Sequence, residues 1–180
     1  MTRANIELPG YTTLPEPDLL FASGRTHKHP LLGLIEHGPY GLQFNALSSL
    51  RLAILAPRKD LAKLVRIIKE LNSPAEPREA RNYYPKYPGF KDLFRIPIVE
   101  QDDRLTIEFP EQLEVHAQRG AKLNLASELF QCTAQLKALR SSFDVALIFL
   151  PENWSECFEG ESFDFHDYLK AFCAPSNLPI

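Results

Sequence analysis

The stretch FDVALIFLPENWSECFEGESFDFHDYLK, from Phe143 to Lys170, decides the fold of this chain. It opens with an apolar run at 145–150 that is too short and too strongly β-forming for a helix. Because the run has no polar alternation, we expect a central strand that is buried on both faces. Pro151 ends the strand, and a polar loop follows. Asp164 then stands where a helix N-cap belongs, which predicts a helix over 165–173.

The start of this helix is the expected ligand site. In open α/β sheets, ligands bind beyond the carboxyl ends of the strands, and a helix N-terminus offers unpaired N–H groups and the positive end of its dipole. His166 and Lys170 are four residues apart and therefore share one helix face. We expect an anion such as phosphate to meet backbone donors, an imidazole and an ammonium there.

A regular α/β pattern precedes this stretch. An apolar run at 51–56 predicts a strand, and apolar residues at helical spacing predict helices over 59–72 and 124–141. Two shorter strands are expected near 95–99 and 104–109, the second at a sheet edge because its residues alternate. The predicted class is therefore α/β, a Rossmann-like layer with a mainly parallel sheet and right-handed crossovers.

The first 48 residues have a different character, because they are rich in Pro, Gly and His and lack sustained periodicity. A short strand at 19–21 and an apolar plug at 31–35 could not bury themselves alone. We expect residues 1–48 to form an extended lead-in that packs on a neighbouring domain, and residues 49–180 to form the α/β domain. The ending SNLPI resembles the approach to another strand, so we expect the sequence to stop ahead of further structure.

Composition narrows the function. The chain has 180 residues, 44% of them hydrophobic, and a formal net charge of −3, which argues against a broadly basic surface that coats nucleic acid. Three cysteines without metal-type spacing indicate reduced thiols in a cytoplasmic protein. No apolar run approaches the roughly 20 residues that cross a bilayer, so no membrane partner is expected.

Two basic segments have competing interpretations. Tyrosines and lysine in the loop 73–90 resemble the aromatic and basic mixture that stacks on single-stranded nucleic acid. Turn chemistry alone explains the composition, however, and favours a proline-rich loop whose tyrosines pack on the sheet. The basic residues of the 59–72 helix either track phosphates or form a solvated face. The residues concerned are Tyr83, Tyr84, Tyr87 and Lys86 in the loop, and Lys59, Lys63, Arg66 and Lys69 on the helix.

Catalytic signatures are missing from the sequence. It contains no GxSxG, GxxxxGK[ST], HExxH or strand-following GxGxxG motif, and no paired acid and base. His27, His29 and His37 have no cysteine or carboxylate partner at regular spacing, so we interpret them as surface histidines and expect no metal site. We therefore expect no enzymatic activity and no cofactor in this chain.

Several segments resemble short prokaryotic Argonaute (Piwi-related) proteins. The lead-in LPEPDLLFASG and HPLLGLIEHGPYG, followed by RLAILAP, looks like the start of these proteins. DVALIFLP and HDYLKAFCAP look like the passage where their MID domain runs into PIWI. In Argonautes the MID domain is a Rossmann-like fold that holds the 5′ end of the guide strand, with a Tyr and, four residues later, a Lys on one helix and a Gln about a dozen residues beyond.

The resemblance implies a role for two residues. His166 takes the place of the Tyr that stacks on the first guide base, and Lys170 that of the phosphate-binding Lys. His in place of Tyr departs from the pattern, although an imidazole also stacks and donates to phosphate. The Gln would fall just past Ile180, and the PIWI carboxylates would lie beyond the chain. The resemblance thus implies a non-catalytic module, with Mg²⁺ at the guide 5′-phosphate only in the complete protein.

Three hypotheses follow. The first is a guide-binding MID module whose partners are a guide RNA or DNA, its complementary target, the PIWI half and a PAZ-analogous effector subunit. The second is an α/β module that binds a small phosphorylated ligand at the same helix. In the third, the domain is purely structural or mediates interactions, and His166 and Lys170 form an ordinary exposed pair.

Overall fold

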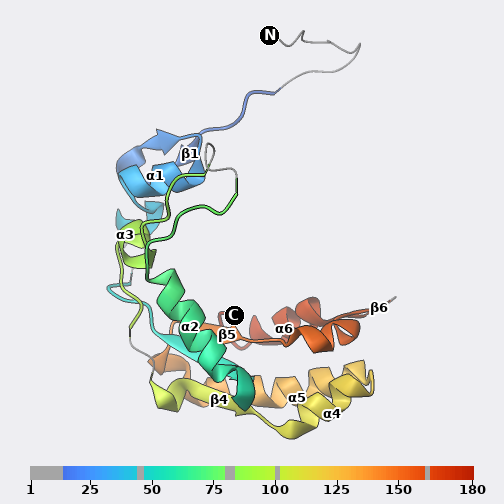
Figure 1. The fold of residues 1–180 in the computed structure, drawn as a ribbon. Coiled ribbons are helices and arrows are strands. Elements are labelled where there is room, and N and C mark those ends of the chain that lie inside the picture. Colours follow the sequence, from blue (N-terminus) through green and yellow to red (C-terminus); the bar gives the residue numbers. More distant parts are fainter. Residues whose placement is uncertain (1–13, 44–46, 80–83, 100–101, 161–162) are drawn as a thin grey trace, which may run out of the picture.

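The computed structural model describes residues 14–43, 47–79, 84–99, 102–160 and 163–180. Its centre is a three-stranded parallel sheet of order β4-β3-β5, formed by β3 (Leu52–Pro57), β4 (Thr106–Phe109) and β5 (Val145–Ile148) (Figure 1). Ile54 of β3 is level with Thr106, and Leu52 is level with Val145. The predicted α/β class and the parallel sheet are confirmed.

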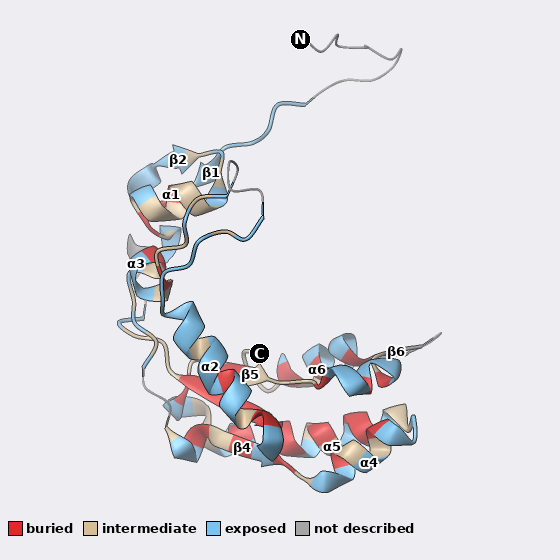
Figure 2. Cartoon of the chain, viewed as in Figure 1, coloured by how far each residue is buried: buried red, intermediate tan, exposed pale blue. Residues whose placement is uncertain are grey.

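Helices cover both faces of this sheet. One face packs on α4 (Glu111–Gln118), α5 (Lys122–Gln135) and α6 (Phe165–Cys173), which together enclose the larger hydrophobic core. Among the described residues, the other face packs on α2 (Leu61–Leu71), through a small cluster around Ile54 and Leu64. Figure 2 shows the buried residues concentrated between the sheet and α4, α5 and α6. The fold thus has its main core on one side and a thinner layer on the other.

The prediction that residues 145–150 form the central strand is wrong. Every residue of β3 is buried, whereas β5 lies at one edge of the three strands and only its Ala146 is fully buried. An apolar run without alternation fits a strand with both faces covered, but it carries no information about which strand lies in the middle. The outer edge of β5 is met by the end of the described chain, since the Ala146 N–H donates to the Pro179 carbonyl at 2.8 Å.

The strand predicted at 95–99 is also wrong. α3 (Phe90–Phe94) ends at Arg95, which has the left-handed φ of 63°, and only one parallel bridge follows, between Leu50 and Ile98. Pro97 lacks an N–H group, so a longer ladder cannot form. The second predicted strand exists as β4, which alternates in burial and lies at the other edge, as expected.

The helix predictions hold except at their ends. α2 follows a 3-10 turn at Arg58–Asp60, and α5 begins at Lys122 and passes into 3-10 turns at Leu136–Ser142. α4 was not predicted, because only Leu113 and Ala117 of its eight residues are buried and its apolar stripe is too short to stand out. None of the described helices is long and apolar enough to cross a membrane.

The lead-in is folded rather than extended where the structure describes it, which corrects the expectation. A hairpin of β1 (Leu19–Leu20) and β2 (Thr26–His27) precedes α1 (Pro30–His37), and together they form an N-terminal unit that stands apart from the sheet (Figure 1). Phe21 is buried against α1, and Arg95 Nη2 donates to the Ile35 carbonyl at 2.9 Å. A second hairpin, β6 (Glu159–Gly160) with β7 (Phe163–Asp164), leads into α6.

Gly33 gives a first testable prediction, because a methyl group added there would overlap the ring of Phe21. Overpacking of this kind costs about 1–3 kcal/mol. We expect Gly33→Ala to open the N-terminal unit, so that tryptic cleavage at Arg25 and Lys28 becomes about tenfold faster. Gly41→Ala is the control, since nothing lies within 4 Å of the added methyl group. Equal cleavage rates in both variants would contradict the packing of Phe21 on α1.

Candidate functional site

The predicted ligand helix begins where expected. The carboxylate of Asp164 accepts a hydrogen bond from the Asp167 N–H at 3.0 Å, so Asp164 is the N-cap of α6. Phe165, Leu169 and Cys173 are buried in the main core and fix the helix through one face. The opposite face of α6 is therefore held outward.

His166 and Lys170 lie on this outward face. The His166 side chain is 70% exposed, and Lys170, one turn later, is exposed as well. Within the described part of the chain, the Lys170 ammonium has no hydrogen-bond or ion-pair partner, so its three donors are available to a ligand. His166 Nδ1 lies 3.9 Å from a carboxylate oxygen of Asp167. The two predicted residues are thus brought together on one exposed surface.

The charge at this helix start is less favourable to an anion than the sequence indicates. The Asp167 N–H is already used by the Asp164 carboxylate, and two carboxylates flank the first turn. An anion near α6 would therefore rely on Lys170 and the imidazole more than on backbone donors. This limits the predicted contribution of the helix N-terminus.

The ligand atoms of Asp164, His166 and Asp167 lie within 4.8 Å of one another, close enough to share a metal ion. The two carboxylates suit Mg²⁺, whereas imidazole suits transition metals better. All three groups are exposed, and one carboxylate already caps α6. Mixed donors of this kind are a poor fit to Mg²⁺.

The aromatic loop is partly committed to structure. Tyr83 lies outside the described residues. The Tyr87 hydroxyl donates to the Leu71 carbonyl at 2.8 Å, and partial burial raises its pKa. Lys86 pairs with Glu76 at 2.9 Å, and Tyr84 is 51% exposed. Tyr84 is thus the more exposed of the two described tyrosines in this loop.

The N-terminal histidines serve the local fold. His27 Nδ1 accepts from the His29 N–H at 2.8 Å, and His29 Nδ1 accepts from the Leu32 N–H at the start of α1. His37 packs near Phe21, with their ring centroids 6.2 Å apart. These contacts show that His27 and His29 hold the turn before α1, and all three histidines are partly buried.

The cysteines are also structural. All three are free and buried. Burial raises the pKa of Cys132 to about 11, and it raises the pKa of Cys157 and Cys173 as well. Neutral thiols of this kind are unreactive near pH 7.

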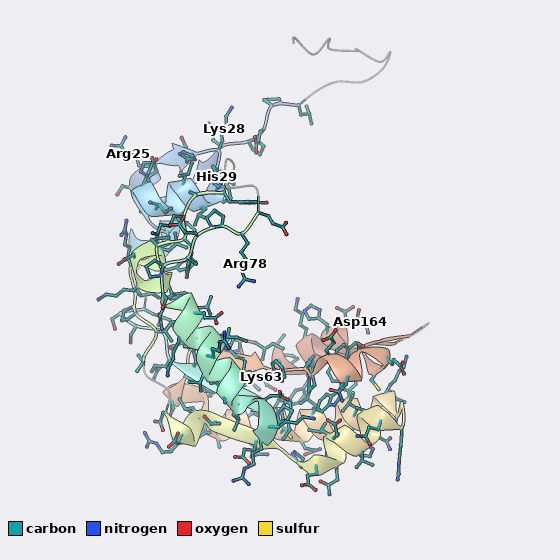
Figure 3. All side chains as sticks on the ribbon, viewed as in Figure 1. Arg25, Lys28, His29, Lys63, Arg78 and Asp164 are labelled. Atoms are coloured by element: carbon teal, nitrogen blue, oxygen red, sulfur yellow. The ribbon has the colours of Figure 1, made fainter. Side chains whose placement is uncertain are left out.

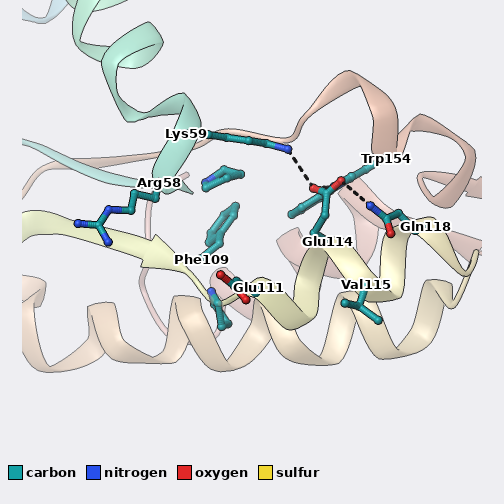
Figure 4. A pocket seen from close by; sticks show the side chains of 10 residues that line it. Arg58, Lys59, Phe109, Glu111, Glu114, Val115, Gln118 and Trp154 are labelled. Atoms are coloured by element: carbon teal, nitrogen blue, oxygen red, sulfur yellow. Dashed lines mark hydrogen bonds and ion pairs between the residues drawn. The ribbon is translucent and has the colours of Figure 1, made fainter.

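Sequence reasoning missed two clefts at the carboxyl edge of the sheet. The first, which we call the apolar cleft, has a volume of about 400 Å³ and lies between the segments that follow β3 and β4 (Figure 4). Its walls include Phe109, Val115 and Trp154. The polar groups that line it are Arg58, Lys59, Glu111, Glu114 and Gln118. Phe109 and Trp154 stack with ring centroids 6.0 Å apart.

Glu114 joins the walls of the apolar cleft. It accepts hydrogen bonds from Trp154 Nε1 at 2.9 Å and Asn153 Nδ2 at 2.8 Å, and Lys59 Nζ lies 3.4 Å away. The Trp154 hydrogen bond, followed by those of Asn153 and the charge of Lys59, holds the pKa of Glu114 below its usual value, although burial acts in the opposite direction. Glu114 therefore ties α4 to the loop after β5 across forty residues of sequence.

The second cleft, which we call the charged cleft, has a volume of about 570 Å³ and lies between the segments that follow β3 and β5. It is lined by Lys59, Asp60, Lys63, Phe149, Pro151, Glu152 and Asn153. The Asp60 side chain is only 4% exposed, and its carboxylate accepts from Lys63 at 2.5 Å. Figure 3 shows Lys63 on α2 and Asp164 at the start of α6, both in the half of the molecule that holds the sheet.

The comparisons with known proteins add no family assignment. No model of a known protein family matches the chain, and no characterised protein matches it at a significant level.

Proposed function

We propose that this chain is a non-catalytic, cytoplasmic nucleic-acid-binding module that holds the 5′-phosphate end of a guide strand, as the MID domain of a short prokaryotic Argonaute does. The observation that carries the proposal is the outward face of α6. His166 and Lys170 stand one turn apart there, exposed, while buried residues on the other face fix the helix. The imidazole stacks on the first base, and the ammonium binds the terminal phosphate.

The rest of the proposal follows from this role. The helix comes after β5 of the parallel sheet, from which the β6–β7 hairpin leads into it, and ligands in α/β folds usually bind beyond the carboxyl ends of parallel strands. The partners are a guide RNA or DNA, its complementary target, a PIWI half and a PAZ-analogous effector subunit. Exposed Tyr84 is a candidate for a further base contact. Any Mg²⁺ would belong to the guide phosphate in the complete protein.

Lys170→Ala tests the anchor directly. Its ammonium makes a charge-assisted hydrogen bond to a terminal phosphate, so we expect affinity for 5′-phosphorylated guides to fall about tenfold to a hundredfold. Binding of 5′-hydroxyl guides should scarcely change. His166→Ala should weaken both kinds of guide by about tenfold, because a stacked base is lost whatever the terminus. The measurement is fluorescence anisotropy with labelled single strands at one fixed salt concentration.

Lys91→Ala is the matched control, because Lys91 is an exposed lysine on a different helix, α3. Lys91→Ala should lower the affinity for 5′-phosphorylated and for 5′-hydroxyl guides only by the general electrostatic contribution of one charge. Equal losses for both guides in Lys170→Ala would make Lys170 a general backbone contact. No loss in either α6 variant would refute the proposed anchor.

A further inference from the structure

The apolar cleft and the charged cleft meet at one residue. Lys59 lines both, and its side chain extends from the end of β3 toward Glu114 on α4 (Figure 4). The strand order β4-β3-β5 means that the chain passes to one side of β3 and then to the other. The charged cleft lies between the ends of β3 and β5, at this switch in direction. Open α/β sheets bind their ligands at such a point.

We propose that the two clefts together bind a mononucleotide, with its ring in the apolar cleft and its phosphate on Lys59 and Lys63. This site is separate from α6 and does not depend on the proposed guide anchor. The ligand class follows from the lining, which offers an apolar wall on one side of Lys59 and ammonium groups on the other.

The apolar cleft suits a flat ring. Its volume of about 400 Å³ lies within the range of small-molecule pockets. Phe109 and Trp154 form a rigid floor because both are buried and stacked, and Val115 is 41% exposed at the rim. The Gln118 amide donates one hydrogen bond to Glu114 at 3.3 Å, which leaves its second N–H and its carbonyl oxygen to meet the edge of a base.

The lysines can take a phosphate at small cost. Their side chains are 61% exposed at Lys59 and 68% exposed at Lys63. The pair between Lys59 and Glu114 is solvated and long, so breaking it costs little. Glu114 keeps its bonds from Trp154 and Asn153 when Lys59 turns away. Lys63 has three donors and can serve Asp60 and a phosphate together.

The carboxylates of the charged cleft limit how tightly we expect it to bind a phosphate. Asp60 is neutralised by Lys63, but exposed Glu152 has no lysine of its own within the described residues and would repel a phosphate. Binding should therefore be modest. Glu152→Gln is expected to strengthen it, which is a direction that a merely structural role for the cleft would not produce.

The test is titration calorimetry of the full chain with adenosine 5′-monophosphate, adenosine and inorganic phosphate. We expect the nucleotide to bind at least about tenfold more tightly than either half alone. Lys59→Ala and Lys63→Ala should each weaken nucleotide binding by about tenfold and leave adenosine binding unchanged. Gln118→Ala should weaken both by about fivefold. Lys69→Ala, on α2 but outside both clefts, is the control and should change nothing.

The outcomes separate this site from the guide anchor. Because the proposed anchor on α6 could itself take a 5′-monophosphate, the titrations are repeated in the Lys170→Ala background. Nucleotide binding that Lys59→Ala still weakens there belongs to the two clefts, whatever the outcome for the guide anchor. Displacement of the nucleotide by a 5′-phosphorylated oligonucleotide would show that the site takes a nucleotide within a strand, and absence of displacement would show a free one. No binding up to about 10 mM, or binding that is insensitive to Lys59 and Lys63, would overturn the inference.

Discussion

Asp144→Ala should lower the free energy of unfolding by about 3 kcal/mol at pH 7. The Asp144 side chain is 10% exposed and accepts three hydrogen bonds from Arg51: from its backbone N–H at 2.8 Å, from Nε at 3.1 Å and from Nη2 at 2.8 Å. These bonds join the residue before β3 to the residue before β5 and so fix the register of the two strands. The substitution leaves an Arg51 N–H without its acceptor, which is the costly part. Urea denaturation measures the effect.

The loss of unfolding free energy in Asp144→Ala should depend on pH in a defined direction. Hydrogen bonds from Arg51, more than its charge, hold the pKa of Asp144 below its usual value. A lowered folded-state pKa stabilises the fold above the unfolded pKa of about 3.9, and this stability is lost as the pH falls through the folded value. The difference between wild type and Asp144→Ala should therefore be constant from pH 7 to pH 5 and shrink below about pH 4.

Glu70→Ala is the control for Asp144. It removes the Arg66 pair, in which the two atoms lie 2.9 Å apart but both side chains are well exposed. Such a pair contributes little, so the unfolding free energy should hardly change. A comparable loss in both variants would show that burial of Asp144 is not what makes its pair strong.

Features that depend on residues close together in the sequence could be predicted. Asp164 caps α6 because the N-cap bond spans only three residues, and the apolar run of β3 marks a strand on its own. The exposed positions of His166 and Lys170 follow equally from helix periodicity. The pattern cannot rank strands within a sheet, and this is why β5 was predicted as the centre when β3 occupies it.

The clefts depend on contacts between distant segments. Glu114 meets Trp154 and Lys59 only after α4 and the loop beyond β5 have packed together, and α4 itself lacks a clear apolar stripe. In the sequence, Lys59 and Lys63 are compatible with a solvated helix face. In the structure, Phe149 and Pro151 from the segment after β5 line the same cleft as these lysines. The strand order would have pointed to the clefts, but the order is known only once the three-dimensional pairing of the strands is known.

Trp154→Ala should have the largest effect on stability, about 3–5 kcal/mol. Trp154 is 1% exposed, and its ring stacks on Phe109 in the main core. Truncation leaves a cavity and also removes the hydrogen bond to Glu114. It is the only tryptophan of the chain, so unfolding of the variant must be followed by far-ultraviolet circular dichroism.

Trp154→Phe separates the hydrogen bond from the packing. Phenylalanine keeps most of the apolar contact but cannot donate to Glu114, so we expect a smaller loss of about 1–2 kcal/mol at pH 7. The pKa of Glu114 is lowered in the folded chain, first by the Trp154 hydrogen bond. That bond therefore stabilises the fold above the unfolded pKa of about 4.3, and its contribution disappears as Glu114 is protonated.

The gap between wild type and Trp154→Phe should consequently close as the pH falls below about 4, while the gap between Trp154→Phe and Trp154→Ala persists because it measures apolar packing. Phe172→Leu is a control whose loss should not vary with pH, because Phe172 is a partly buried residue whose ring packs on Phe130. If the Trp154→Phe gap stayed constant down to pH 3, the indole would act through its volume alone. Glu114 would then not be the group that holds the loop after β5 to α4.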